Sequence, residues 1–77
     1  MKRWEVNHAG HMIAVENRWN SERLYVNGDL QDERIGLSSQ SRLYGRLGNG
    51  ETIKVSIGGV LQIHCRVFVN DKLVLSE

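Results

Sequence analysis

A long alternation of apolar and polar residues between Glu51 and Leu75 limits the fold of this chain more than any other feature. A period of two, rich in β-branched residues, is typical of strands that bury one face. The apolar positions on either side of Gly58-Gly59 are Ile53, Val55, Ile57, Leu61, Ile63, Cys65, Val67 and Val69. We therefore expect two strands here to supply much of the core, with the polar residues between these positions exposed.

The connection between these two strands sets their register. A two-residue turn at Gly58-Gly59 would pair Val55 with Gln62 and so mix the faces. A three-residue loop over 58–60 keeps the faces apart, because cross-strand partners share a face. The pairs that it predicts are Ile57–Leu61, Val55–Ile63, Ile53–Cys65, Lys54–His64 and Thr52–Arg66. Val60 is the weak point, since this position often favours a left-handed residue, and a bulge at the glycines would relieve it.

The first half of the chain contains two further hairpin signals. Ala9-Gly10 predicts a two-residue turn with the pairs Val6–Ile13, Trp4–Val15 and Arg3–Glu16. Asn27-Gly28 favours a type I′ turn and predicts the pairs Tyr25–Leu30 and Arg23–Asp32. In the second hairpin Leu24 and Val26 would face polar partners. The return strand, 29–33, is therefore either a short edge or a strand shifted by a bulge.

The remaining turns complete an all-β pattern. Gly48-Asn49-Gly50 predicts a three-residue loop with positive φ at Gly50 and the pairs Leu43–Val55 and Gly45–Ile53. Asn70-Asp71 predicts a turn onto 72–75, while 17–22 and 34–41 are expected to be loops and 30–35 a single helical turn at most. The whole, 1–77, is predicted to be one domain. We expect a small antiparallel meander of about seven or eight strands that forms a sandwich or half-open barrel.

Composition narrows the class of protein. The chain has ten Lys and Arg against nine Asp and Glu, so bulk charge indicates neither nucleic-acid nor membrane binding. Its single cysteine, Cys65, excludes a disulfide within the chain and favours a reducing cytoplasm. The polar start, with Trp4 and Glu5 soon after Met1, does not resemble a signal peptide, and no stretch is long and apolar enough to span a membrane.

No residue pattern predicts catalysis. His8 and His11 flank a turn and could begin a metal site, but zinc needs three or four ligands, so we interpret them as exposed turn residues. Cys65 and His64 are adjacent on a strand and point to opposite faces, which favours an inert buried thiol. The carboxylates of Asp29, Asp32 and Glu33 are best explained as a solvated strand edge. No glycine-rich phosphate loop occurs. We therefore expect a non-enzyme without a cofactor.

The aromatic and basic residues suggest an interaction surface. Trp19, Tyr44, Phe68 and Arg66 are the candidates, because Phe68 lies on the polar-alternating side of its strand. Together with other exposed residues they could form a platform for single-stranded nucleic acid. Those further residues are Tyr25, Arg42 and Arg46. The alternative is that such residues are covered by a second layer or by a dimer contact.

Several of these segments, taken in order, resemble the Fas apoptosis inhibitory molecule family. The matching pieces are His11-x-Ile13-x-Val15-Glu16-Asn17, Ser21-x-Arg23-x-Tyr25-Val26-Asn27-Gly28, Leu47, Ile53-x-Val55 and Val67-x-Val69-Asn70-Asp71-Lys72-Leu73. The segment after Gly28 is polar where the family is rich in aromatic residues, and Asp71 replaces the closing glycine. The resemblance implies an antiparallel β-sandwich and a protein-binding role. It transfers no catalytic residues, and it does not carry the animal cell-death function.

The function expected from the sequence is that of a non-catalytic, protein-binding module that associates with itself. Apolar residues on the expected solvent faces favour a homodimer, because a second copy would cover them. These residues are Met12, Ala14, Tyr44 and Phe68. The alternative function is a single-stranded nucleic-acid-binding module that uses aromatic and arginine side chains.

Overall fold

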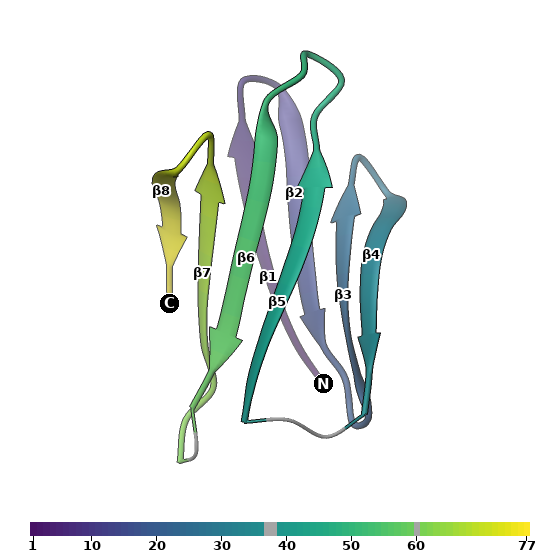
Figure 1. The fold of residues 1–77 in the computed structure, drawn as a ribbon, viewed down its shortest axis with the longest axis vertical. Helices are drawn as coiled ribbons and strands as arrows, with labels where there is room; N and C mark the ends of the chain where they lie inside the picture. The colour runs from purple at the N-terminus through teal and green to yellow at the C-terminus, as the bar shows by residue number, and fades with distance from the viewer. Residues whose placement is uncertain (37–38, 60) are drawn as a thin grey trace.

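The protein is built of eight antiparallel strands in two four-stranded sheets (Figure 1). The computed structural model describes residues 1–36, 39–59 and 61–77, and no helix occurs among them. The first sheet contains β1 (Lys2–His8), β2 (His11–Asn17), β3 (Ser21–Val26) and β4 (Asp29–Ile35). The second contains β5 (Gln40–Arg46), β6 (Thr52–Gly58), β7 (His64–Val69) and β8 (Lys72–Ser76). The predicted all-β meander is confirmed.

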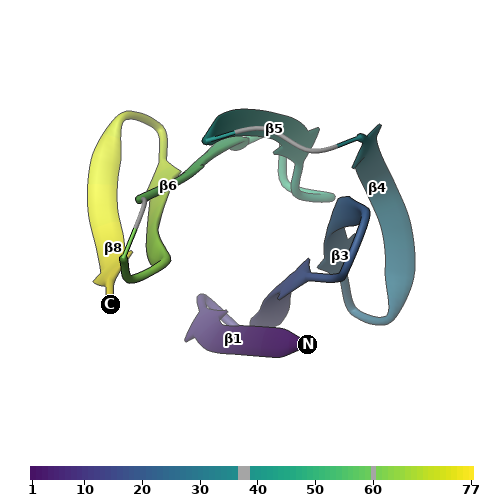
Figure 2. The same cartoon turned by 90° about the horizontal axis from the view of Figure 1, so that it is seen from below.

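Each strand pairs with the next strand along the chain inside its own sheet, and the two sheets face each other as two layers. Figure 2 shows that the layers approach each other where β4 leads to β5. At the other edge, β1 and β8 touch over only a few residues. No ladder joins β4 to β5 or β8 to β1, so the sheets do not close into a barrel. The fold is a small, open-edged sandwich.

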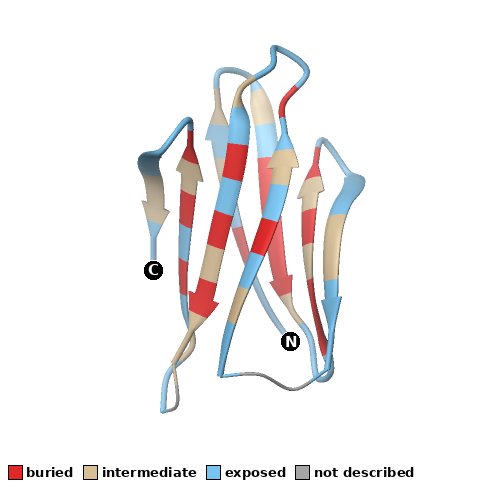
Figure 3. Cartoon of the chain, viewed as in Figure 1, coloured by how far each residue is buried: buried red, intermediate tan, exposed pale blue. Residues whose placement is uncertain are grey.

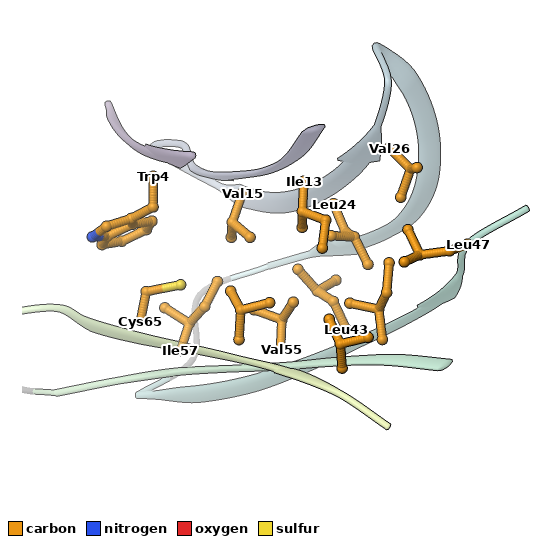
Figure 4. Close-up of a cluster of buried hydrophobic side chains, with 13 residues drawn as sticks. Trp4, Ile13, Val15, Leu24, Val26, Leu43, Leu47, Val55, Ile57 and Cys65 are labelled. Atoms are coloured by element: carbon orange, nitrogen blue, oxygen red, sulfur yellow. The ribbon is translucent and has the colours of Figure 1, made fainter. Parts of the chain in front are cut away.

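The core lies between the two sheets and follows the alternation of the sequence. Buried and exposed residues alternate along β6 and β7 (Figure 3). Side chains of both layers meet in one cluster (Figure 4). Its members are Trp4, Ile13, Val15, Leu24, Val26, Leu43, Leu47, Ile53, Val55, Ile57, Cys65, Val67 and Val69. Both sheets thus contribute their apolar face, as period-two strands with one buried face require.

Besides the turn at Asn27-Gly28, three further predicted turns are confirmed. The β1–β2 hairpin turns at Ala9-Gly10 with the three expected pairs. The β5–β6 hairpin has the expected pairing of Leu43 with Val55, and Gly50 has a φ of 92°. Asn70 and Asp71, with φ values of 49° and 65°, turn β7 onto β8. Positive φ at both central residues is the geometry of a type I′ turn, which matches the twist of the flanking strands.

The predicted register of β6 and β7 is wrong by four residues. Ile57 pairs with Cys65 rather than Leu61, and Val55 pairs with Val67 rather than Ile63. The connection therefore runs from Gly59 to Ile63, and it leaves Leu61 99% exposed. Ile63, expected in the core, is only partly buried. An even shift keeps each residue on the same face of the sheet, which is why the predicted buried face survives. Val60 lies outside the described residues.

The β3–β4 hairpin turns at Asn27-Gly28, with φ values of 51° and 86°, and contains a bulge. Tyr25 pairs with Leu30 as expected, but Leu24 pairs with Asp32, and Arg23 pairs with Glu33 instead of Asp32. The sequence left two alternatives for the return strand, a short edge or a shift by a bulge, and the structure shows the bulge. It puts Gln31 opposite no residue of β3, at the point where the register shifts.

Three segment boundaries also differ from the sequence prediction. The segment 30–35 is strand rather than helical turn. The predicted loop 17–22 is shortened to 18–20, because β2 includes Asn17 and β3 begins at Ser21, and the predicted loop 34–41 is shortened by both β4 and β5. Leu37 and Ser38 lie outside the described residues. Apart from Leu30 and Ile35 the misassigned residues are polar, and the prediction relied on apolar alternation, which polar edge strands lack.

Polar side chains of β4 join the two sheets. The backbone N–H of Tyr44 donates to Oδ2 of Asp32 at 2.9 Å, and that of Arg46 donates to Oε1 of Gln31 at 3.3 Å. Nε of Arg34 donates to the carbonyl oxygen of Arg42 at 3.1 Å. We call these three contacts the β4–β5 junction. They satisfy backbone groups on the edge of β5 that no strand pairs.

Gly45 allows this close approach. A β-carbon built there would lie 3.0 Å from Cδ2 of Leu24 and 3.2 Å from Oε1 of Gln31, so neighbouring side chains would have to move. We expect Gly45→Ala to lower the free energy of unfolding by about 1–3 kcal/mol, the usual effect of overpacking.

Gly48→Ala is the matched control for this prediction. No atom lies within 4 Å of a β-carbon at Gly48, and its φ is outside the left-handed region. Urea unfolding should show little loss, or a small gain from reduced freedom of the unfolded chain. An equal loss in the two variants would contradict the tight packing at Gly45.

Candidate interaction surface

Cross-strand register places basic and aromatic side chains together on the outer face of the second sheet. Tyr44, Lys54 and Phe68 are direct neighbours across β5, β6 and β7. Such partners hold their β-carbons about 4.5–5.5 Å apart on one face. The next row contains Arg42, Ser56 and Arg66. We call the outward side chains Arg42, Tyr44, Arg46, Lys54, Arg66 and Phe68 the basic–aromatic face.

The two aromatic rings of this face are not equally available to a partner. Tyr44 is 51% exposed, whereas Phe68 is only partly exposed. Nζ of Lys54 lies 5.3 Å from the centroid of the Phe68 ring, within cation–π range. Lys54 therefore covers part of Phe68, and Tyr44 offers the more open ring.

The ionisable side chains of the second sheet have one sign. Its four strands contain Arg42, Arg46, Lys54, Arg66 and Lys72 and no Asp or Glu. None of the ion pairs found among residues 1–36, 39–59 and 61–77 involves these five. The charges of this face are thus left for solvent or for an anionic partner.

The outer face of the first sheet, by contrast, holds several ion pairs between its own side chains. The buried Glu16 carboxylate pairs with Arg18 at 2.8 Å and with Arg3. Burial works to raise the pKa of Glu16, yet the hydrogen bonds and charges of Arg18 and Arg3 outweigh it and lower that pKa. Glu33 pairs with Arg23 on the same sheet.

The structure brings together three of the four residues expected to form an interaction surface. Tyr44, Phe68 and Arg66 share the basic–aromatic face. Trp19 lies instead in the loop between β2 and β3 and is 86% exposed. Tyr25 is on the first sheet, where Arg3 lies 5.9 Å from its ring centroid. The aromatic platform therefore has fewer rings than the sequence suggested.

Trp19 lies at one end of the sandwich, where other exposed apolar residues also occur. It lines a hollow of about 180 Å³ whose other lining residues are Gly36, Ile63 and the polar residues Asn17, Arg18, Ser21 and Glu22. Ile35, beside Gly36, is 78% exposed, and Leu61, in the same loop as Ile63, is 99% exposed. We call Trp19, Ile35 and Leu61 the apolar end. Ala14, expected on a solvent face, is buried and leaves Met12 as the exposed apolar residue of β2.

The two turn histidines make separate contacts. Nε2 of His8 lies 3.5 Å from Oε1 of Glu51, and Nδ1 of His11 lies 3.2 Å from Nδ2 of Asn27. Within the described ranges, no three His, Cys, Asp or Glu side chains gather in a way that could hold a metal ion.

The remaining titratable candidates are also accounted for. Cys65 is fully buried while His64 is exposed, so the two side chains diverge as predicted. Asp32 is part of the β4–β5 junction and Glu33 pairs with Arg23, whereas Asp29 is exposed. These carboxylates face different partners and do not form an acid–base pair.

Comparisons with protein-family models, with curated proteins and with solved structures gave no match. The resemblance to the Fas apoptosis inhibitory molecule family therefore stays a prediction. The described part of the chain has no helix long and apolar enough to cross a membrane.

Cys65 makes the stability of the protein depend on pH in the alkaline range. Burial, with a smaller contribution from Glu77, raises the pKa of its thiol from 9.0 to about 12. The unfolded chain loses this proton above about pH 9, whereas the folded chain keeps it to about pH 12. The stabilising contribution is thus complete below about pH 9 and is lost as the pH rises towards 12.

Denaturant unfolding between pH 9 and 11 checks this expectation. The free energy of unfolding should fall more steeply in the native protein than in Cys65→Ala, by up to about 1.4 kcal/mol per pH unit. The comparison cancels the titration of lysines and tyrosines. Parallel curves would show that the thiol is not held in a buried, protonated state.

Proposed function

We propose that this protein is a non-catalytic interaction module that binds an acidic segment of a partner protein through the basic–aromatic face. The observation that carries the proposal is the division of charge between the two sheets. In the first sheet Glu5, Glu16 and Glu33 pair with arginines, whereas the second sheet presents four outward cations that take part in none of the ion pairs found in the described residues. An acidic segment would supply the missing charges.

The composition of the face supports this choice. Tyrosine and arginine are enriched where proteins bind one another, because each combines apolar area with directional hydrogen bonding. Tyr44 is half exposed at the centre of a strand, with Arg42 and Arg46 two residues away on the same face. Complementary charge would also speed encounter with the partner and make it salt-dependent.

Single-stranded nucleic acid is the second candidate partner. Stacking of bases on Tyr44 and Phe68, beside the arginines, is the observation in its favour. The coverage of Phe68 by Lys54 and the location of Trp19 on another surface reduce the area available for stacking. The near-balanced charge of the whole chain also favours a protein partner.

Charge reversal tests the proposed face. A fluorescein-labelled oligoglutamate peptide should bind the native protein at low salt, and Arg46→Glu or Lys54→Glu should weaken binding by about tenfold or more. Lys2→Glu on β1 is the control, because it makes the same change in net charge on the other sheet. Equal losses in all three variants would contradict a defined face.

An oligothymidylate measured in parallel separates the two partners. The proposal expects the acidic peptide to be bound at least as tightly as the oligonucleotide at the same salt concentration. Tighter oligonucleotide binding that is lost in Tyr44→Ala would favour the nucleic-acid function instead.

Self-association is a second property that we propose, and the apolar end is the observation that favours it. Large side chains as exposed as Trp19 and Leu61, gathered at one end, mark contact surfaces more often than isolated exposed residues do. A second copy placed end to end would cover them.

Sedimentation velocity over a range of concentrations tests this property. The native protein should show dimers, and Trp19→Ser with Leu61→Ser should restore monomers without loss of stability, because both side chains are exposed in the monomer. Phe68→Ser, on the other surface, should leave the dimer intact. A monomer at every concentration would refute self-association.

A further inference from the structure

A hollow of about 270 Å³ opens on the basic–aromatic face near the end of β6. The residues that line it and matter here are Gln40, Arg42, Ser56, Gly58, His64 and Arg66. They belong to two adjacent rows of the sheet, Arg42–Ser56–Arg66 and Gln40–Gly58–His64. The hollow is thus built by three paired strands rather than by a single loop.

Glycine makes the hollow possible. Gly58 is the central residue of the second row and has no side chain, so Gln40 and His64 flank bare backbone. A β-carbon at Gly58 would lie 3.4 Å from Cγ of Gln40 and would point into this space. A larger residue would therefore fill the hollow.

The lining has the chemistry of an anion site. Arg42 and Arg66 stand on either side of Ser56, one residue across the sheet in each direction. Both guanidinium groups can therefore reach an anion above the Ser56 hydroxyl, which would donate a third hydrogen bond. No carboxylate lines the hollow, and neither arginine takes part in an ion pair found in the described parts of the chain.

Arg34 extends this basic character beyond the hollow. Its Nε is tied to the carbonyl oxygen of Arg42 at 3.1 Å, and it lines an adjoining hollow with Arg42 and Ser56. Three arginines, from β4, β5 and β7, therefore lie around one small area of the surface. A single carboxylate would neutralise only part of this charge, whereas a phosphate monoester carries a charge of about −1.5 to −2 and three acceptor oxygens.

We propose that the hollow binds the phosphate group of a phosphorylated serine or threonine in the partner protein. This inference rests on the proposed function and names the group that the acidic segment presents. Paired arginines recognise phosphate by bidentate hydrogen bonds, which lysine cannot reproduce. The row of Tyr44, Lys54 and Phe68 next to the hollow would contact the residues flanking the phosphate.

An amide-resolved NMR titration tests the site. The probes are inorganic phosphate, an acetyl-Gly-phosphoSer-Gly-amide peptide and the same peptide without phosphate. The phosphopeptide and inorganic phosphate should cause saturable shifts at the amides of Ser56, Gly58 and Gly59, and the unmodified peptide should not. Absence of saturable shifts, or shifts spread evenly over both sheets, would overturn the proposal.

Three matched variants separate a defined site from diffuse attraction. Arg42→Gln and Arg66→Gln should each weaken phosphopeptide binding by about tenfold, because each removes one pair of charge-assisted hydrogen bonds. Arg46→Gln removes the same charge from the same face outside the hollow and should change the affinity less than about twofold. Equal weakening by all three would contradict a phosphate site. The amide spectra of the variants show whether each remains folded.

The outcomes distinguish this inference from the function on which it rests. One outcome is that oligoglutamate binds, with weaker binding in Lys54→Glu, while no phosphate probe binds. The phosphate site is then refuted, and the basic–aromatic face remains supported as the site for an acidic segment. If the phosphopeptide binds and oligoglutamate does not, the phosphate site is supported, and the proposed binding of an acidic segment is refuted. Tighter binding of a 5′-phosphorylated oligothymidylate than of the phosphopeptide would contradict the proposal that the phosphate belongs to a protein.

Discussion

The hydrogen bonds between β4 side chains and the β5 backbone are the interaction on which the shape of this molecule depends. At this edge β4 and β5 lie side by side, where a ladder would continue one sheet into the next and begin a barrel. Asp32 and Gln31 instead accept from the N–H groups that such a ladder would use. These backbone groups on the edge of β5 are satisfied without a strand partner, and the sheets remain two layers.

This arrangement also separates the charges of the molecule. Because the sheets are distinct layers, their outer faces point away from each other, and none of the ion pairs found in the described residues joins a carboxylate of the first sheet to a cation of the second. Glu16 and Glu33 find arginines on their own sheet. Arg34 has a part in both the junction and the proposed phosphate site. Its Nε donates to the Arg42 carbonyl oxygen, and its guanidinium is the third one near that site.

The sequence predicts which face of each strand is buried better than it predicts how strands pair. Alternation defines a face, and a shift of four residues between β6 and β7 leaves it unchanged. The same shift matters for the site, because the predicted register puts Arg66 opposite Thr52, whereas the structure puts it opposite Ser56. Tyr44 and Phe68 could be grouped only once that register is known. The junction could not be predicted, since it joins polar side chains to backbone groups distant in the chain.

Native-state hydrogen exchange at the Tyr44 and Arg46 amides tests the junction most directly. Both belong to an edge strand and have no ladder partner on that side, so they would exchange quickly if the junction did not form. The structure predicts slow exchange at both in the native protein. In Asp32→Ala, protection should be lost at Tyr44 and kept at Arg46, which bonds to Gln31. Fast exchange at both amides in the native protein would contradict the β4–β5 junction and the two-layer fold that depends on it.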